Sequence, residues 1–125
     1  MKHERHYSVE QANAALEFVS ERLERLRSAR VQLGDEDARA ALSEAGPSNG
    51  GGEPGRVVSE AFLELQRTLG QLQEMDIVLR DLDRGLVDFP TLRDGEEVYL
   101  CWEEGEDAIG FWHDAESGYG GRQPL

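Results

Sequence analysis

Apolar residues recur at alternating spacings of three and four along two separate stretches of this chain. The first stripe comprises Val9, Ala12, Leu16, Val19, Leu23 and Leu26. The second comprises Val58, Phe62, Leu65, Leu69 and Leu72, continued by Met75, Val78 or Leu79, and Leu82. This spacing lines one face of an α-helix. It predicts two long helices, over residues 8–33 and 57–83, that pack as an antiparallel hairpin of coiled-coil type.

Local signals mark the ends of both predicted helices. Ser8 is a good N-cap, and Gln11 three positions later completes a capping box. Gly85 is a suitable C′ residue for the second helix. Residues 46–55 are rich in Gly, Pro, Ser and Asn, which predicts a flexible surface loop. The pattern leaves open whether residues 35–46 extend the first helix or form a short separate one.

After Gly85 the pattern changes to short runs of β-branched and aromatic residues. One run precedes Pro90, and Asp94-Gly95 is a hairpin turn signal between the first two runs. The pattern predicts a three-stranded antiparallel sheet over residues 86–113 and an irregular tail over residues 114–125. The fold class is therefore α+β, with a single domain over residues 1–125.

Side-chain alternation predicts which strand residues share a face, because successive residues of a strand point to opposite sides. One face is expected to carry Val98, Leu100 and Trp102. A second group is expected to share a face, and it consists of Ile109, Phe111 and His113.

The charge of the chain excludes some partners. Asp and Glu number 26 against 13 Lys and Arg, and the net charge is −13. Such a surface repels phosphate, so we expect neither nucleic acid nor an anionic membrane as partner. Lys2 is the only lysine, which fits either an arginine-rich, GC-biased genome or a halophilic source. Residues 1–6 are expected to form a polar tail. The chain has one cysteine and its N-terminus does not resemble a signal peptide, so we expect a cytoplasmic protein.

Several segments of the last third carry a family resemblance. They are Gly85-Leu86-Val87-Asp88-Phe89-Pro90, Asp94-Gly95, Val98-Tyr99-Leu100-Cys101-Trp102, Ile109-Gly110-Phe111-Trp112-His113 and Gly121-Arg122-Gln123-Pro124-Leu125. Together with the helix start from Ser8 to Asn13, the chain resembles the domain of unknown function 2203, an uncharacterised prokaryotic family. The chain departs from that resemblance at Arg80, where a lysine is expected. The resemblance implies no activity.

Cys101 and His113 are the first candidate site. With a carboxylate such as Asp88, Asp114 or Glu116 they supply the ligand set of zinc, so a divalent metal is one hypothesis for a cofactor. A nucleophile and its base is a second hypothesis. In the third, Cys101 is a small buried side chain and His113 is a hydrogen-bonded residue at a strand end.

Carboxylates and a cation form the second candidate site. Asp81 and Asp88, with Asp83, could bind a hard cation or could cap turns. Arg122 is expected to pair with Asp88 or Asp81 and so hold the tail. The alternative is an anion pocket lined by aromatic side chains, namely Trp102, Trp112 and Tyr119.

Two functions follow from these patterns. The first is a non-enzymatic interaction or scaffold domain that forms a homodimer through its helical hairpin, since matched apolar stripes favour association. The alternative is a small-molecule or metal-binding protein, with an enzyme included in that class. Its site residues would be Asp81, Asp88, Cys101, His113 and Arg122.

Overall fold

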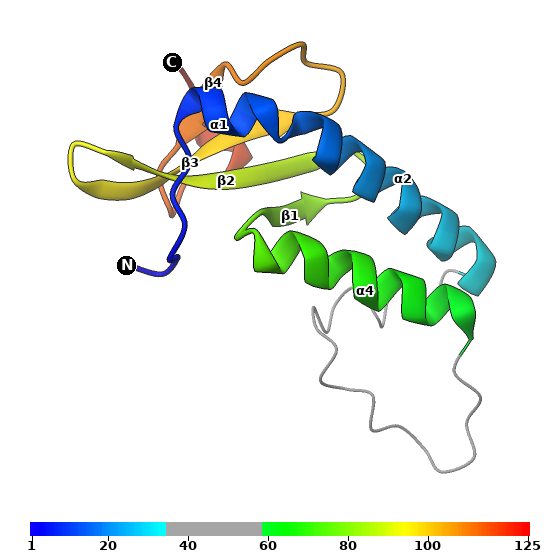
Figure 1. The fold of residues 1–125 in the computed structure, drawn as a ribbon. Helices are drawn as coiled ribbons and strands as arrows, with labels where there is room; N and C mark the ends of the chain where they lie inside the picture. The colour runs from blue at the N-terminus through cyan, green and yellow to red at the C-terminus, as the bar shows by residue number, and fades with distance from the viewer. Residues whose placement is uncertain (35–58) are drawn as a thin grey trace.

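The computed structural model describes residues 1–34 and 59–125, in which a helical hairpin packs against one face of an antiparallel sheet (Figure 1). In chain order the elements are α1 (Val9–Ala14), α2 (Leu16–Leu33), α4 (Glu60–Glu74), β1 (Val78–Asp81), β2 (Leu86–Arg93), β3 (Glu96–Glu103), β4 (Phe111–His113), a 3-10 turn (Tyr119–Gly121) and β5 (Gln123–Pro124). The predicted loop 46–55, and the alternatives for residues 35–46, lie outside the described residues. No helix within the described ranges has the length and apolarity needed to cross a bilayer.

The first predicted helix is present with one tightened turn. The Ser8 Oγ accepts from the Gln11 N–H at 3.1 Å, and the Gln11 Oε1 accepts from the Ser8 N–H at 2.9 Å. This confirms the predicted capping box. The N–H of Ala15 approaches the carbonyls of both Gln11 and Ala12, which separates α1 from α2, and the helix then continues.

The second predicted helix ends well before residue 83. Asp76 adopts a left-handed conformation with φ of 58°. Its N–H donates to the Gln73 carbonyl at 3.0 Å, and the N–H of Ile77 donates to the Leu72 carbonyl at 3.0 Å. These two bonds form a Schellman motif, which terminates α4. Asp76 therefore takes the C′ role that the sequence analysis assigned to Gly85.

Gly85 has a different role from the predicted one. It lies in the turn between β1 and β2 with φ of 67°. A Cβ atom there would come within 2.5 Å of the Cβ of Glu104, so no larger side chain fits without displacement. The turn, rather than a helix end, requires glycine at this position.

The sheet has five strands in the order β1-β2-β3-β4-β5, instead of the three predicted. The edge strand β1 is formed by residues that were assigned to the second helix. The opposite edge, β5, is formed by the tail that was expected to be irregular. The predicted turn between β2 and β3 is confirmed, since Asp94 and Gly95 both have positive φ, 53° and 81°.

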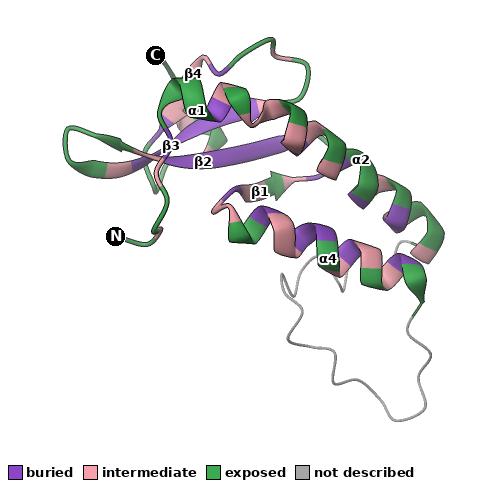
Figure 2. Ribbon diagram, in the orientation of Figure 1, coloured by how far each residue is buried: buried purple, intermediate pink, exposed green. Residues whose placement is uncertain are grey.

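The strand register assigns side chains to the two faces of the sheet. Val87 lies opposite Trp102 and Phe89 opposite Leu100, and these four join the core with the helices. Ile109 also joins this core, so the prediction that it shares a face with Phe111 and His113 is wrong. Figure 2 shows that β2 and β3 are buried along most of their length.

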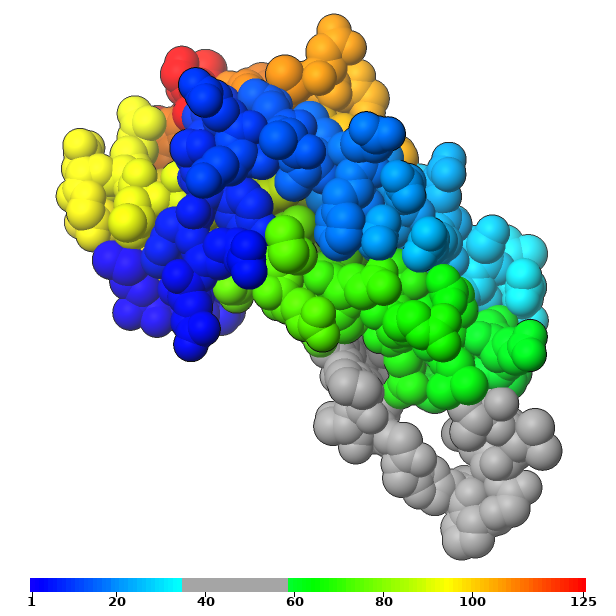
Figure 3. All heavy atoms as spheres, in the orientation of Figure 1, coloured from blue at the N-terminus to red at the C-terminus, as the bar shows by residue number. Residues whose placement is uncertain are grey.

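Residues 1–7, of which 1–6 were expected to form a polar tail, lie against the sheet and the end of α4 (Figure 3). Tyr7 is buried and donates its hydroxyl to the Met75 carbonyl at 2.6 Å. The ring nitrogens of His3 lie 3.1 Å from the Oδ1 of Asp76 and 3.0 Å from the hydroxyl of Tyr99. Hydrogen bonds to distant residues therefore order this segment.

Candidate functional site

The sheet face away from the helices carries a buried cluster of three side chains, Asp88 from β2, Cys101 from β3 and His113 from β4, here called the Asp–Cys–His cluster. Asp88 lies directly opposite Cys101 in the β2–β3 register. Their ligand atoms and that of His113 all lie within 4.8 Å of one another. The three residues are 1%, 1% and 2% exposed. Three strands thus bring together three residues that are far apart in the sequence.

Two hydrogen bonds hold the imidazole of His113. Its Nδ1 lies 2.6 Å from the backbone carbonyl of Asp114, and its Nε2 lies 2.9 Å from the Oδ2 of Asp88. The Asp114 carbonyl can only accept a hydrogen bond, so we place a hydrogen on the Nδ1 of His113. Nε2 then faces the Asp–Cys–His cluster, where it contacts the Oδ2 of Asp88.

The two carboxylate oxygens of Asp88 have different surroundings. Oδ2 accepts from the Nε of Arg80 at 2.7 Å as well as contacting His113. Oδ1 is buried and has no hydrogen-bond partner among residues 1–34 and 59–125. A buried polar atom without a partner carries a desolvation cost of about 1–3 kcal/mol, and the thiol of Cys101 is a neighbouring group that interacts with this carboxylate.

Cys101 is a neutral thiol at ordinary pH. Burial, together with the adjacent charge of Asp88, raises its pKa to about 12. A nucleophilic cysteine needs a thiolate, which is favoured by a lowered pKa and by access to substrate. Both nitrogens of His113 are already held, by Asp114 and by Asp88. The geometry therefore offers little to the nucleophile hypothesis and more to a ligand or structural role.

Asp81 and the two tryptophans, which were predicted site residues, lie outside this cluster. Asp81 caps a turn, since its Oδ1 accepts from the N–H of Arg84 at 3.1 Å. Trp102 belongs to the core on the helix side and donates its Nε1 to the Glu106 carbonyl at 3.0 Å. Trp112 packs against the same core, opposite Leu100 in the register. They do not converge with Asp88, because the register places both tryptophans on the other face.

Arg122 has a partner other than the predicted ones. Its Nη2 donates to both carboxylate oxygens of Glu106, at 2.7 and 2.8 Å, and approaches the Cys101 carbonyl at 3.4 Å. Its guanidinium carbon lies 4.0 Å from the centroid of the Phe111 ring. The expected pairing with Asp88 or Asp81 is wrong, because Arg80 occupies Asp88. Arg122 still connects the tail to β3 and β4, beside the Asp–Cys–His cluster.

Arg80 contacts the Asp–Cys–His cluster, although the sequence analysis placed it in neither candidate site. The sequence analysis placed it in a helix, whereas the structure places it at a bulge of β1, between Leu79 and Asp81. From there it reaches Asp88, and its guanidinium carbon lies 5.2 Å from the Tyr99 ring centroid. No sequence signal announces the bulge, since it depends on the pairing of β1 with β2.

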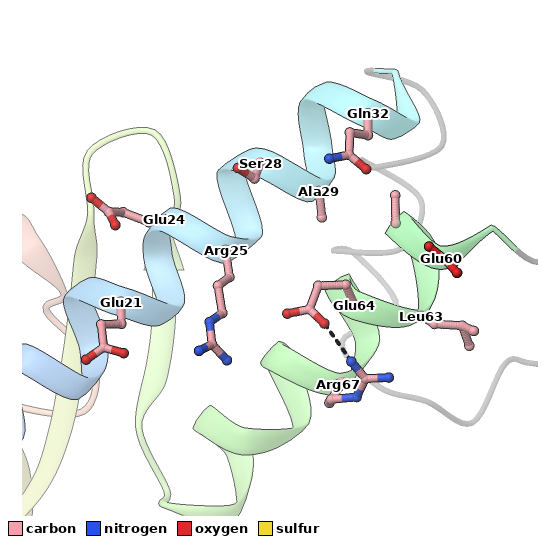
Figure 4. A pocket seen from close by; sticks show the side chains of 11 residues that line it. Glu21, Glu24, Arg25, Ser28, Ala29, Gln32, Glu60, Leu63, Glu64 and Arg67 are labelled. Carbon is pink, nitrogen blue, oxygen red and sulfur yellow. Dashed lines mark hydrogen bonds and ion pairs between the residues drawn. The ribbon is translucent and has the colours of Figure 1, made fainter.

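A groove of about 830 Å³ lies between α2 and α4. Figure 4 shows Arg25 of α2 and Glu64 of α4 pointing into the space between the helices. Glu64 also accepts from Arg67 at 2.6 Å. Charged side chains of both signs line the groove, which is typical of a solvated ion-pair surface rather than an apolar ligand site.

The apolar stripes of the two helices face each other within the chain. Leu23 and Leu26 of α2, and Leu65 and Leu72 of α4, are at most 1% exposed and belong to one core. The matched stripes are therefore explained by packing inside a single chain. A homodimer could not form through these buried stripes, from which it was predicted, and would need a different face of the hairpin.

Fold and cluster together define an α+β protein built as a helical hairpin on an antiparallel meander. The chain belongs to the DUF2203 family, described as an uncharacterized conserved protein, whose model matches residues 5–125. This confirms the resemblance inferred from the last third of the sequence. Neither a curated protein nor a solved structure matches the chain.

Proposed function

We propose that this protein binds a divalent transition metal of the zinc class through the Asp–Cys–His cluster. The observation that carries the proposal is the convergence of three buried ligand atoms beside a carboxylate oxygen that has no partner among the described residues. Thiolate, imidazole and carboxylate are the ligands that zinc takes in proteins. A cation placed between them would satisfy the Oδ1 of Asp88.

The orientation of His113 supports this assignment. Metal-binding histidines commonly donate one ring N–H to a backbone carbonyl, which directs the other nitrogen at the metal. In this chain Nδ1 contacts the Asp114 carbonyl at 2.6 Å and Nε2 faces Asp88 and Cys101. The backbone therefore presents Nε2 as the ligand atom.

Charge balance also favours a divalent cation. A thiolate at Cys101 and a carboxylate at Asp88 together carry two negative charges, which are costly in a buried site unless they are compensated. Binding must displace the thiol proton of Cys101, whose pKa is raised to about 12 by burial and by Asp88. Metal affinity is therefore expected to rise with pH. The ligand atoms must also close to about 3.5 Å from one another, as tetrahedral zinc requires.

A titration with Co²⁺ tests the proposal, because cobalt replaces zinc and reports its ligands by colour. We expect a sulfur-to-cobalt charge-transfer band that saturates near one equivalent and disappears in Cys101→Ser. His6→Asn serves as the control, because it removes another histidine, which contacts Glu97 instead of the cluster. The acidic surface binds cations weakly everywhere, but carboxylates alone give no sulfur band.

The titration of the wild-type protein decides the question even if a variant fails to fold. If one equivalent of Co²⁺ produces no sulfur band between about pH 7 and about pH 8.5, the metal proposal is wrong. The Asp–Cys–His cluster would then be a structural network of hydrogen bonds.

A further inference from the structure

A second cavity, of about 540 Å³, lies between the N-terminal segment, the end of α4 and the edge strand β1. Its volume falls within the range of small-molecule pockets. Apolar side chains make up much of its lining, and they include Leu69, Ile77, Val78 and Leu79. This cavity therefore offers an apolar surface large enough for the body of a small organic ligand.

The charges at this cavity are unlike those of the rest of the protein. The lining includes Lys2, Arg80 and His3, with Asp76 as its one acidic residue, in a chain whose net charge is −13. Asp76 is already engaged, because its two oxygens accept from His3 at 3.1 Å and from the Arg5 N–H at 3.2 Å. The only lysine of the chain, Lys2, has no ion-pair partner for its ammonium within residues 1–34 and 59–125.

We propose that this cavity binds an amphipathic organic anion, namely a carboxylate carried on an apolar chain or ring. The carboxylate would pair with the ammonium of Lys2 and with the terminal nitrogens of Arg80, whose Nε is held by Asp88. The apolar body would lie against the side chains of β1 and α4. Two cations beside an apolar surface match this ligand class better than a neutral or a cationic one. The proposal does not rest on metal binding, although Arg80 lies at the cavity and also contacts Asp88 of the Asp–Cys–His cluster.

Octanoate is a suitable probe, with 1-octanol and octylammonium as ligands of the same chain length and different charge. The titration is followed by amide chemical shifts of the full-length protein. We expect the shifts to map to residues 1–3 and 69–82, and octanoate to bind about tenfold more tightly than 1-octanol. Octylammonium is expected to bind weakest at this cavity, although the overall charge of the protein favours cations.

Lys2→Gln should weaken octanoate binding about threefold, as expected for one exposed ion pair. Arg67→Gln is the matched control, because it removes one positive charge from a side chain that is 62% exposed and lies outside this cavity. It should leave the affinity unchanged. His113→Asn should also leave octanoate binding unchanged while removing cobalt binding, which separates this proposal from the preceding one.

Three results would overturn the anion site. If octanol binds as tightly as octanoate, the cavity recognises only apolar surface. If octylammonium binds as well as octanoate, the overall charge rather than Lys2 and Arg80 governs binding. If the octanoate shifts map outside residues 1–3 and 69–82, the ligand binds at another place and the proposed site is wrong.

Discussion

The Nε of Arg80 donates to the Oδ2 of Asp88 over 2.7 Å, and this bond joins the cavity beside β1 to the Asp–Cys–His cluster. A positive charge next to a metal ligand opposes a bound cation, whereas the same charge at the cavity favours a bound anion. One residue should therefore influence the two proposed sites in opposite directions.

Arg80→Gln is accordingly expected to raise the affinity for Co²⁺ about tenfold and to lower the affinity for octanoate about threefold. Both titrations are done on one preparation, with Arg84→Gln as control. Arg84 is similarly exposed, and it pairs with Glu103 at the end of β3. A fall in both affinities would mean that the substitution only loosens the sheet.

Cys101 should make the protein less stable in alkali. Its folded-state pKa of about 12 lies above the ordinary value, because burial and Asp88 disfavour the thiolate. The thiol therefore stabilises the fold fully below the unfolded-state pKa of about 8.5, and this contribution is lost as the pH rises towards 12.

Urea unfolding between about pH 7 and about pH 10.5 measures this effect. The free energy of unfolding should fall more steeply with pH in the wild type than in Cys101→Ala. Tyr7 and Tyr99, whose pKa values are raised chiefly by burial, contribute in the same direction in both proteins. Parallel curves would show that Cys101 does not titrate differently in the folded state.

Leu23→Asp should unfold the hairpin rather than dissociate a dimer. Leu23 is fully buried within the chain, so the substitution places a charge in an apolar core at a cost of about 3–5 kcal/mol. Val31→Asp lies on the same helix at a position 81% exposed and should cost less than about 0.5 kcal/mol. Circular dichroism and light scattering distinguish the cases, since a folded monomeric Leu23→Asp protein would support association through this stripe.

The contact between Arg122 and Glu106 should hold the C-terminal tail in place. Arg122→Lys and Glu106→Gln are each expected to accelerate hydrogen exchange over residues 114–125. The lysine ammonium cannot reproduce the stacking on Phe111, and Glu106→Gln removes the negative charge that Arg122 pairs with. A double-mutant cycle should give a coupling of about 1 kcal/mol. Strict additivity would contradict a direct interaction between the two side chains.

Salt should stabilise the protein. At a net charge of −13 the folded state repels itself, and screening shortens the Debye length from about 10 Å at 0.1 M to about 3 Å at 1 M. The melting temperature is therefore expected to rise from low salt to molar KCl. A falling melting temperature would mean that screened attractive pairs, such as Arg27 with Glu104, outweigh the repulsion.

The sequence by itself determined the hairpin of β2 and β3, and with it two of the three members of the Asp–Cys–His cluster. Asp94 and Gly95 form a two-residue turn, and such a turn fixes the pairing of both strands by counting outward from it. That count pairs Arg93 with Glu96 and, further along, Asp88 with Cys101. The capping box at Ser8 and the apolar stripes are likewise local signals, which is why they could be predicted.

Only the tertiary structure decided how His113 and Arg80 join this pair. His113 follows a connection over residues 104–110 that sets no register of its own, so the pairing of β4 with β3 depends on packing. Arg80 reaches Asp88 because α4 ends at a left-handed Asp76 and the chain pairs with β2 through a bulge. Helical periodicity continues through this segment of the sequence, but the long-range pairing of strands prevails over it.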